Sequence, residues 1–178
     1  MALKATIYKC DLTIADMDRH YYVDQSLTIA RHPSETDERL LVRLLSFARF
    51  ASLEPEFTKD LFDTDEPAIW SKDLTGALKL WIELGHPDES KVRKACNRVE
   101  QVAIVTYSHA TPVWWKQNQS KFTQFKNLSV LHLPSSAVQE LAAQMSRGME
   151  LQINVQDGDW SVSLGGDPLQ VDWEVLQD

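Results

Sequence analysis

The sequence predicts an α/β fold, because short apolar strands and amphipathic helices alternate along most of its 178 residues. Between residues 69 and 107 the expected order is strand, strand, helix, strand, which is typical of an α/β core with its site at the strand ends. Alternating segments at both chain ends predict an added antiparallel β region. We therefore expect one domain over residues 1–178, with its core at about 34–133 and the β region at about 1–31 and 149–176.

Two alternating segments predict a long antiparallel hairpin at the start of the chain. Residues 3–15 and 20–31 alternate apolar and polar side chains along most of their length, the second through Tyr21, Val23, Leu27 and Ile29, and residues 16–19 (DMDR) turn the chain between them. His20, beside this turn, is expected to be exposed and to have no ligand role. The apolar side of the first segment is formed by Tyr8, Cys10, Leu12 and Ile14.

A helix is expected to follow this hairpin. Ser34 or Thr36 has the side chain of an N-cap, and leucines and alanines then recur at helical spacing to about Ala51. Glu35 and Glu38 lie in the first turn, where the helix dipole favours acidic side chains.

A second hairpin forms the centre of the predicted core. An acidic connecting segment at residues 52–65, with room for a short helix, leads to the apolar run at 68–70. Residues 73–76 (DLTG) have the composition of a tight turn, because Asp bonds its own backbone and Gly accepts a positive φ. Residues 77–84 return with strand periodicity, and Gly85 ends the strand.

Helices and strands continue to alternate after this hairpin, and the chain then ends in strands. The expected elements are a helix at 89–100, a strand at 101–107, a helix from Thr111, a strand at 128–133, a helix to about 145, and strands at about 150–156, 160–164 and 169–175.

Trp114 and Trp115 have both a structural and a functional interpretation, whereas His132 has a structural one. Trp114 and Trp115 are adjacent on a predicted helix, so they cannot share one face. One is expected in the core and the other partly exposed, where base stacking is the functional alternative. His132, inside a buried strand, is expected to be a hydrogen-bonded core histidine.

Composition limits the classes of protein that this chain can be. The net charge of −8 disfavours a general nucleic-acid coat, since such coats neutralise phosphates with excess positive charge. No apolar run has membrane-spanning length and the first residues lack a signal-peptide core, so we expect a cytoplasmic protein that does not bind membranes. Cys10 and Cys96 have no spacing that suits a disulfide framework or a zinc site.

Positive charge is nevertheless concentrated in one part of the chain. Between Glu89 and Lys126 seven basic residues face only two acidic ones, Glu89 and Glu100. A local basic strip beside carboxylates suits a site for phosphodiesters, and a solvated helix face is the structural alternative. The basic residues are Lys91, Arg93, Lys94, Arg98, Lys116, Lys121 and Lys126.

Asp73 and Glu83 are the candidate metal ligands of the central hairpin. Asp73 lies at its tip and Glu83 ten residues later, near the end of the returning strand. If the hairpin curls, their carboxylates converge on one hard cation, and oxygen ligands suit Mg²⁺ or Mn²⁺. In the structural alternative Asp73 only closes its own turn and Glu83 is an edge-strand charge, with Lys79 or Lys94 as an ion-pair partner.

Several segments of the chain resemble the YaeQ family, a group of small bacterial proteins. They are residues 32–36 (HPSET), 66–67 (EP), 81–85 (WIELG) with 87–89 (PDE), and 93–96 (RKAC), so the resemblance runs across nearly the whole chain. The central third, with Lys72-Asp73-Leu74 and then Glu83, also resembles the PD-(D/E)-x-K nuclease superfamily. That resemblance implies a restriction-endonuclease-like mixed sheet core flanked by helices, to which the N-terminal hairpin and the C-terminal strands add their antiparallel β region.

The superfamily resemblance implies roles for individual residues. Asp73, Glu83 and the backbone carbonyl of Leu84 would bind Mg²⁺ or Mn²⁺. Glu38, with Glu35 as the second choice, would assist from the first helix.

The chain departs from the superfamily motif at the catalytic lysine. Gly85 occupies the position of this lysine, and Lys72 occupies the position of the motif proline. In some relatives the lysine has moved to the following helix, which nominates Lys94, or Lys91 one turn earlier.

The resemblance therefore implies a divalent-metal-dependent nuclease that hydrolyses phosphodiesters of nucleic acid. The alternative is a non-catalytic module that retains the nuclease fold and binds a protein or a nucleic acid. The acidic net charge and Gly85 favour the binding module, whereas the Asp73 and Glu83 pair favours the enzyme.

Overall fold

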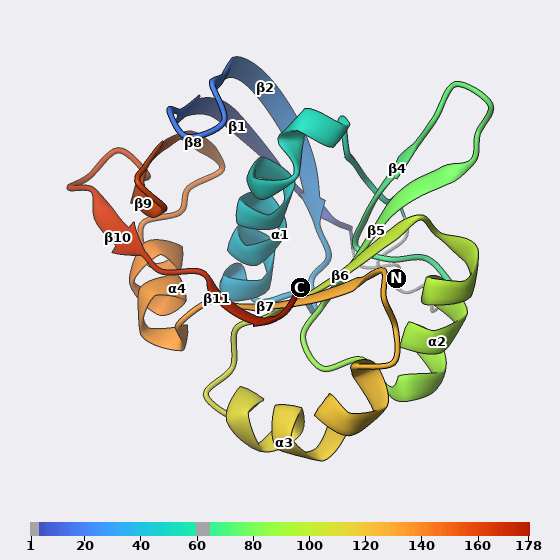
Figure 1. Ribbon diagram of the computed structural model, residues 1–178. Helices are drawn as coiled ribbons and strands as arrows, with labels where there is room; N and C mark the ends of the chain where they lie inside the picture. The colour runs from blue at the N-terminus through green and yellow to red at the C-terminus, as the bar shows by residue number, and fades with distance from the viewer. Residues whose placement is uncertain (1–3, 60–64) are drawn as a thin grey trace. The chain divides into compact units, whose positions relative to one another are not determined.

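The computed structural model describes residues 4–59 and 65–178, and it shows a mixed α/β fold with two mixed sheets (Figure 1). The chain divides into two compact units. The first unit comprises Met1–Leu41 and Ser136–Asp172, and the second comprises Val42–Ser135 and Trp173–Asp178. Each unit contains one of the sheets. Within the described residues, no helix combines the length and the apolar character needed to cross a bilayer.

The first unit confirms the predicted N-terminal hairpin. Strands β1 (Thr6–Asp16) and β2 (Tyr21–Arg31) pair antiparallel along their whole length, from Thr6 opposite Arg31 to Asp16 opposite Tyr21. Their apolar side chains alternate between buried and exposed, as the period of two requires.

The C-terminal strands join this hairpin in a way that the sequence pattern did not predict. Strand β8 (Gly148–Gln156) pairs with β1 in parallel, so the expected antiparallel β region is a mixed sheet. Its order is β10 (Leu169–Val171), β9 (Asp159–Ser163), β8, β1, β2. The chain reaches β8 from helix α4 (Ser135–Ala142) and not from a tight turn, and a crossover of this kind allows a parallel pair. Strand β9 (Asp159–Ser163) then pairs antiparallel with β8.

The strand expected at 169–175 is two strands in different sheets. Strand β10 (Leu169–Val171) pairs with β9 in the first unit, whereas β11 (Glu174–Gln177) pairs with β7 (Leu128–His132) in the second. Asp172 and Trp173 belong to neither strand and separate the two. The Arg49 guanidinium carbon lies 4.8 Å from the centroid of the Trp173 ring.

The second unit contains a six-stranded sheet with a parallel centre. Strands β5 (Leu78–Leu84), β6 (Gln101–Thr106) and β7 run parallel. Helices α2 (Glu89–Arg98) and α3 (Thr111–Phe122) link them, as expected for consecutive β-α-β connections. Strands β4 and β3 add antiparallel on one side, and β11 adds on the other. In sheet order the strands are β11, β7 (Leu128–His132), β6 (Gln101–Thr106), β5 (Leu78–Leu84), β4 (Ile69–Lys72) and β3 (Glu56–Phe57).

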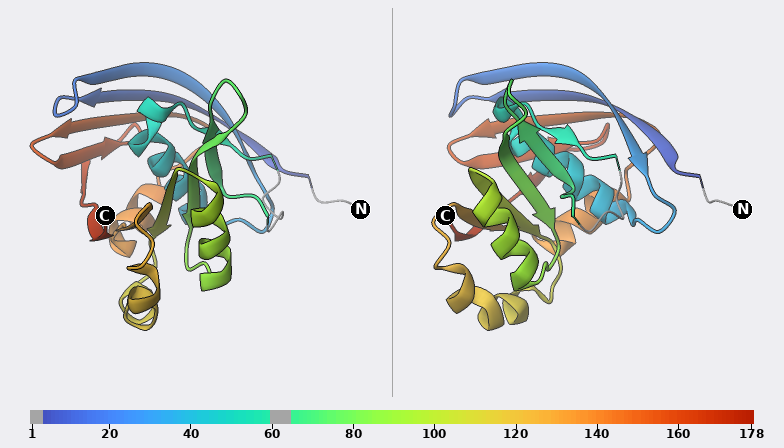
Figure 2. Two further views of the ribbon diagram at one scale, coloured as in Figure 1. Left: turned by 45° about the vertical axis from the view of Figure 1, so that its right-hand side comes forward. Right: turned by 90° about the vertical axis from the view of Figure 1, so that its right-hand side faces the viewer.

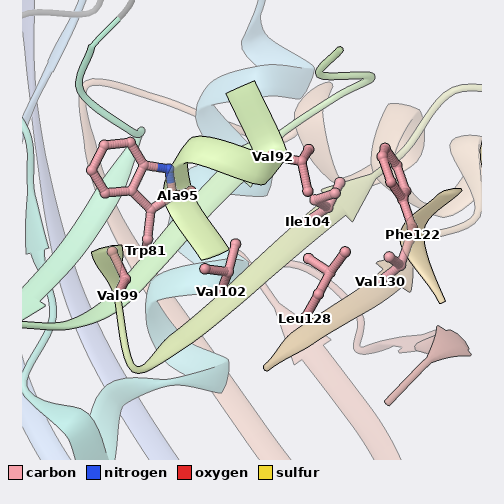
Figure 3. Packing of buried hydrophobic residues seen from close by; sticks show 9 residues of the cluster. All are labelled: Trp81, Val92, Ala95, Val99, Val102, Ile104, Phe122, Leu128 and Val130. Atoms are coloured by element: carbon pink, nitrogen blue, oxygen red, sulfur yellow. The ribbon is translucent and has the colours of Figure 1, made fainter. Parts of the chain in front are cut away.

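Helices α2 and α3 bury their apolar faces in one cluster against this sheet (Figure 3). Helix α2 contributes Val92 and Ala95, and helix α3 contributes Phe122. The strand residues in the cluster include Trp81, so the face of β5 that carries Trp81 is the face beneath α2. In both views of Figure 2 the tip of the β4–β5 hairpin projects beyond α2 and lies at the far side of this helix from α3.

Two predicted elements have different bounds from those expected. The first helix, α1, is Asp37–Arg49, and its cap is Thr36, whose hydroxyl oxygen accepts from the Arg39 N–H at 3.2 Å. The segment at 52–65 contributes a one-turn 3-10 helix, Ala51–Leu53, and strand β3, while residues 60–64 lie outside the described residues.

Candidate functional site

Asp73 closes the tip of the β4–β5 hairpin with its own carboxylate. One oxygen, Oδ1, accepts from the backbone N–H of Thr75 at 2.8 Å and of Ala77 at 3.0 Å, and also from the Thr75 hydroxyl at 2.6 Å. These donors, the Thr75 hydroxyl first, lower the pKa of Asp73. Gly76 completes the turn with a φ of 86°. Asp73 therefore closes its own turn, as the structural alternative for this residue predicted.

The structure does not bring Asp73 and Glu83 together. Ile69 lies opposite Ile82 and Ser71 opposite Leu80, so β5 leads away from the tip to Glu83. The register shifts once, between Ser71 and Lys72, and β4 and β5 stay paired on both sides of this shift. Glu83 follows the tip residue Ala77 by six residues, which corresponds to roughly 20 Å of extended strand. The convergence of the two carboxylates on one cation, as expected from the sequence, is thus not formed.

Glu83 lies at the other end of β5, beneath helix α2. It is only 6 % exposed, and its Oε1 accepts from the indole N–H of Trp81 at 2.8 Å. The ammonium of Lys91, in the first turns of α2, lies 3.1 Å from the same oxygen. Of the two lysines nominated from the sequence, Lys91 is therefore the one in contact with Glu83.

The backbone explains why glycine occupies the position expected for a lysine. Gly85 has a φ of 86°, and its N–H donates to the Val105 carbonyl at 2.9 Å as the chain leaves β5. A Cβ at this position would meet no atom within 4 Å, so the constraint is the left-handed backbone and not space. A lysine here would be strained, whereas Lys91 supplies an ammonium from the helix.

Lys94 lines a groove nearer the hairpin tip. This hairpin groove, with a volume of about 700 Å³, lies between α2 and the β4–β5 hairpin. The Lys72 ammonium lies 4.0 Å from the centroid of the half-buried Trp70 ring. The charged and aromatic residues that line the groove are Asp65, Glu66, Trp70, Lys72, Lys94 and Arg98.

The basic residues of α2 form a continuous stripe along this side of the molecule. Lys91, Lys94 and Arg98 are spaced by three and four residues, so they share one face of the helix over roughly 10 Å. The stripe leads from Glu83 at one end to the hairpin groove at the other, where the Arg98 guanidinium lies 5.6 Å from the centroid of the Trp81 ring.

The other residues of the predicted site belong to the first unit or have structural roles. Glu35 is buried and pairs with Arg39 at 2.8 Å, and Glu38 is half-buried in the first turn of α1. Both belong to the first unit, whereas Asp73 and Glu83 belong to the second, so the assistance expected from Glu38 stays a prediction. Leu84 ends β5 beside Val105.

The described residues do not fit the metal centre that the resemblance implies. Across residues 4–59 and 65–178, no group of three or more His, Cys, Asp or Glu side chains is arranged to hold a metal ion. Asp73 is occupied within its turn, and Glu83 is engaged by Trp81 and Lys91. Both cysteines are free thiols, and burial raises the pKa values of Cys10 and Cys96 to about 11 each.

Two histidines that were not assigned to the site lie near the carboxyl ends of the parallel strands. His86 follows β5, bonds the Thr111 hydroxyl through Nε2 at 3.0 Å and stacks on Trp114 with centroids 4.8 Å apart. His132 ends β7 and bonds the Thr106 hydroxyl through Nδ1 at 2.8 Å. Burial lowers the pKa of each imidazole. The sequence signal for both was their position at or just beyond the carboxyl end of a strand in the predicted α/β core.

Comparison with known proteins shows close relatives over nearly the whole chain. The family model described as YaeQ protein matches residues 1–173. A protein of Escherichia coli (strain K12) named "Uncharacterized protein YaeQ" is 48 % identical over 159 residues, which are 89 % of this chain and 88 % of that protein. A protein of the same name from Salmonella typhi is 46 % identical over 159 residues, with the same shares.

Two solved structures are similar along their full length. The crystal structure of YaeQ protein from Xanthomonas axonopodis pv. citri has a TM-score of 0.93 and 45 % identity, and the match covers 97 % of this chain and 98 % of that one. The crystal structure of YaeQ protein from Pseudomonas syringae has a TM-score of 0.93 and 32 % identity, with 98 % and 97 % covered.

The Glu83–Lys91 pair should be energetically coupled. Lys91→Met leaves a buried carboxylate without its cation, and we expect the free energy of unfolding in urea to fall by about 1–3 kcal/mol. In the double variant with Glu83→Gln the loss should be smaller than the sum of the single losses by about 1 kcal/mol or more. Lys94→Met, at an exposed position of the same helix, is the control and should change stability by less than about 0.5 kcal/mol. Additive losses would show that the pair is not coupled.

Stability should decline in mildly acidic solution because of His132. Its folded-state pKa is lowered by burial in spite of the Glu174 carboxylate, so below about pH 6.5 the unfolded chain binds a proton that the folded chain does not. This destabilisation is absent at higher pH and grows as pH falls from about 7 towards 5.

The measurement is the urea-unfolding free energy at several pH values in that window. His132→Asn, which keeps a donor for Thr106, should give a shallower decline than the wild type. His86→Gln should have a smaller effect, because more than a third of His86 is exposed although partial desolvation lowers its pKa. If the free energy of unfolding of His132→Asn declined with falling pH as steeply as that of the wild type, the decline could not be assigned to His132.

Proposed function

The chain belongs to the YaeQ family, and on that premise we propose that it binds a single strand of nucleic acid along the hairpin groove and the basic stripe of α2. The observation that carries this proposal is the combination of cations with an aromatic ring on one surface. Lys72, Lys94 and Arg98 line the groove together with Trp70. A positively charged groove with a ring for stacking is the common device of single-strand binding.

Each component of the groove has a defined part in this binding. Lys94 and Arg98 neutralise phosphates, and the planar guanidinium of Arg98 can donate two parallel hydrogen bonds to one phosphate. Trp70 offers the exposed part of its ring to a base, and the Lys72 ammonium, which lies over this ring, contacts the adjoining phosphate. Glu66 and Asp65 place carboxylates in the same groove, where amino groups of bases are suitable donors.

The size and charge of this surface favour a single strand over a duplex. The basic stripe extends over roughly 10 Å, which is room for a few nucleotides only. The whole chain carries a net charge of −8, which opposes a long electrostatic contact with duplex phosphates. For a single strand, base stacking on an aromatic ring adds binding energy to the phosphate contacts.

Metal-dependent phosphodiester hydrolysis is the second candidate. The observation that favours it is the buried contact between Glu83 and Lys91, an acid and a lysine beside the carboxyl end of a central strand, as in the PD-(D/E)-x-K superfamily that the chain resembles. A bound Mg²⁺ or Mn²⁺ would supply an activated water in such an enzyme. The distance of Asp73 from Glu83 opposes this candidate, so we place strand binding first.

Strand binding should depend on the groove cations. Fluorescence anisotropy with short labelled single-stranded DNA and RNA at low salt should give saturable binding. In Lys94→Glu with Arg98→Glu the affinity should fall by at least about tenfold, or ~1.4 kcal/mol, and its salt dependence should become weaker. Trp70→Ala should cost about 1–3 kcal/mol of binding free energy through lost stacking.

Lys126→Glu is the matched control, because it reverses an exposed charge of the same unit outside the groove. Its affinity should stay close to wild type, apart from a small general electrostatic loss. Circular dichroism should show that all variants are folded. Equal losses in the control and in the groove variants, or no loss in either, would reject the groove as the binding surface.

A calorimetric titration with Mn²⁺ separates the two candidates. Because Asp73 and Glu83 do not converge, we expect no metal uptake that depends on Glu83, and no cleavage of supercoiled, branched or single-stranded DNA or of RNA. Mn²⁺ uptake by the wild type that is lost in Glu83→Gln, together with cleavage of any of these substrates, would restore hydrolysis as the leading function.

A further inference from the structure

A second cavity lies beside α3, at the carboxyl end of β7. This α3 pocket has a volume of about 320 Å³ and lies entirely within the second unit. It shares none of its lining residues with the hairpin groove. The residues that give it chemical character are Thr111, Trp115, Lys116, Gln119, His132 and Glu174.

One wall of the α3 pocket is formed by a face of α3 that carries the Trp115 ring. Pro112, Trp115, Lys116 and Gln119 share one face of α3, because they are spaced by about one helical turn. The Trp115 ring is half-buried and is held by Trp114 and Phe122, with centroids 6.2 Å and 6.4 Å away. A ring fixed in this way and open on one side can stack against a planar ligand.

His132 gives the pocket a directional hydrogen-bond acceptor. The Thr106 hydroxyl donates to the Leu131 carbonyl at 3.2 Å, so its oxygen accepts from the Nδ1–H of His132 at 2.8 Å. This arrangement leaves the lone pair on Nε2. Burial lowers the pKa of His132, which keeps the imidazole in this neutral form at neutral pH.

Charged groups of both signs complete the pocket. Glu174 on β11 lies opposite His132 in the β7–β11 register, so the two acceptors are side by side. Lys116 extends from α3 and provides the ammonium. The pocket therefore combines a stacking wall, an edge of acceptors and one cation, which suits a planar ligand with amino donors and an anionic tail.

We propose that the α3 pocket binds a nucleoside monophosphate whose base carries an amino group. The base lies against Trp115, its amino group donates to His132 Nε2 and Glu174, and its phosphate pairs with Lys116. The pocket volume lies at the small end of ligand sites, as a mononucleotide requires. This site goes beyond strand binding in the hairpin groove, and either proposal can fail without the other.

Isothermal titration of the full chain with AMP, CMP and UMP tests the site. We expect saturable binding of AMP and CMP, and weaker binding of UMP, which lacks the amino donor. Lys116→Ala should weaken AMP binding by about tenfold and leave adenosine binding unchanged. His132→Asn, which removes the acceptor and keeps the Thr106 bond, should weaken AMP binding and reduce the preference over UMP.

Control variants make the assignment decisive. Lys126→Ala and the groove variant Lys94→Glu with Arg98→Glu should both bind AMP like the wild type. Trp115→Phe should retain binding that Trp115→Ala loses, with folding of each checked by circular dichroism. AMP binding that is absent at millimolar concentration, is unchanged in Lys116→Ala and His132→Asn, or is lost in the groove variant would overturn the proposal.

The same chemistry is presented by a free mononucleotide and by the last nucleotide of a strand. An oligonucleotide ending in adenosine should therefore be added to the AMP complex. Displacement of AMP by this oligonucleotide, but not by one ending in uridine, identifies a strand end as a ligand of the pocket. Retention of AMP identifies the free nucleotide as the ligand of the pocket. Either result supports the α3 pocket only if AMP binding is weakened in Lys116→Ala.

Discussion

The burial of one face of α2 against β5 and β6 determines where the charged groups of the second unit lie. Val92 and Ala95 are fully buried in the cluster that contains Trp81, and removing this apolar surface from water fixes the rotation of the helix about its axis. Once that rotation is set, Lys91 meets Glu83 and the rest of the basic stripe faces the hairpin groove. The polar arrangement is thus a consequence of apolar packing.

The left-handed turn at Gly85 has a comparable effect on the choice of residue types. It redirects the chain from β5 towards α2 while its N–H completes the ladder to β6. A side chain at this position would strain the backbone, so an ammonium beside Glu83 has to come from elsewhere. The first turns of α2 lie near Glu83 and supply this ammonium from Lys91. Asp88 caps the start of the helix by accepting from the Lys91 N–H at 2.9 Å.

Local pattern predicted most elements of this fold, but not the contacts between distant ones. Periodicity was sufficient for the β1–β2 hairpin because its partners are neighbours in the chain, whereas the parallel pairing of β8 with β1 depends on residues far away. For the site, DLTG correctly indicated a turn, yet only the strand register shows that Asp73 and Glu83 are far apart. The contact between His86 and Thr111 joins a loop to a helix, and neither segment predicts it alone.

The order of the two units along the chain has a consequence for folding. The first unit is interrupted by the second, and the last residues, Trp173–Asp178, return to the second, so neither unit is one continuous segment. Strand β1 is made first during synthesis but gains its parallel neighbour β8 only after more than a hundred further residues have been made. Such non-local pairing slows the search for the native state, and we therefore expect the local hairpins and β-α-β turns to form before either sheet is complete.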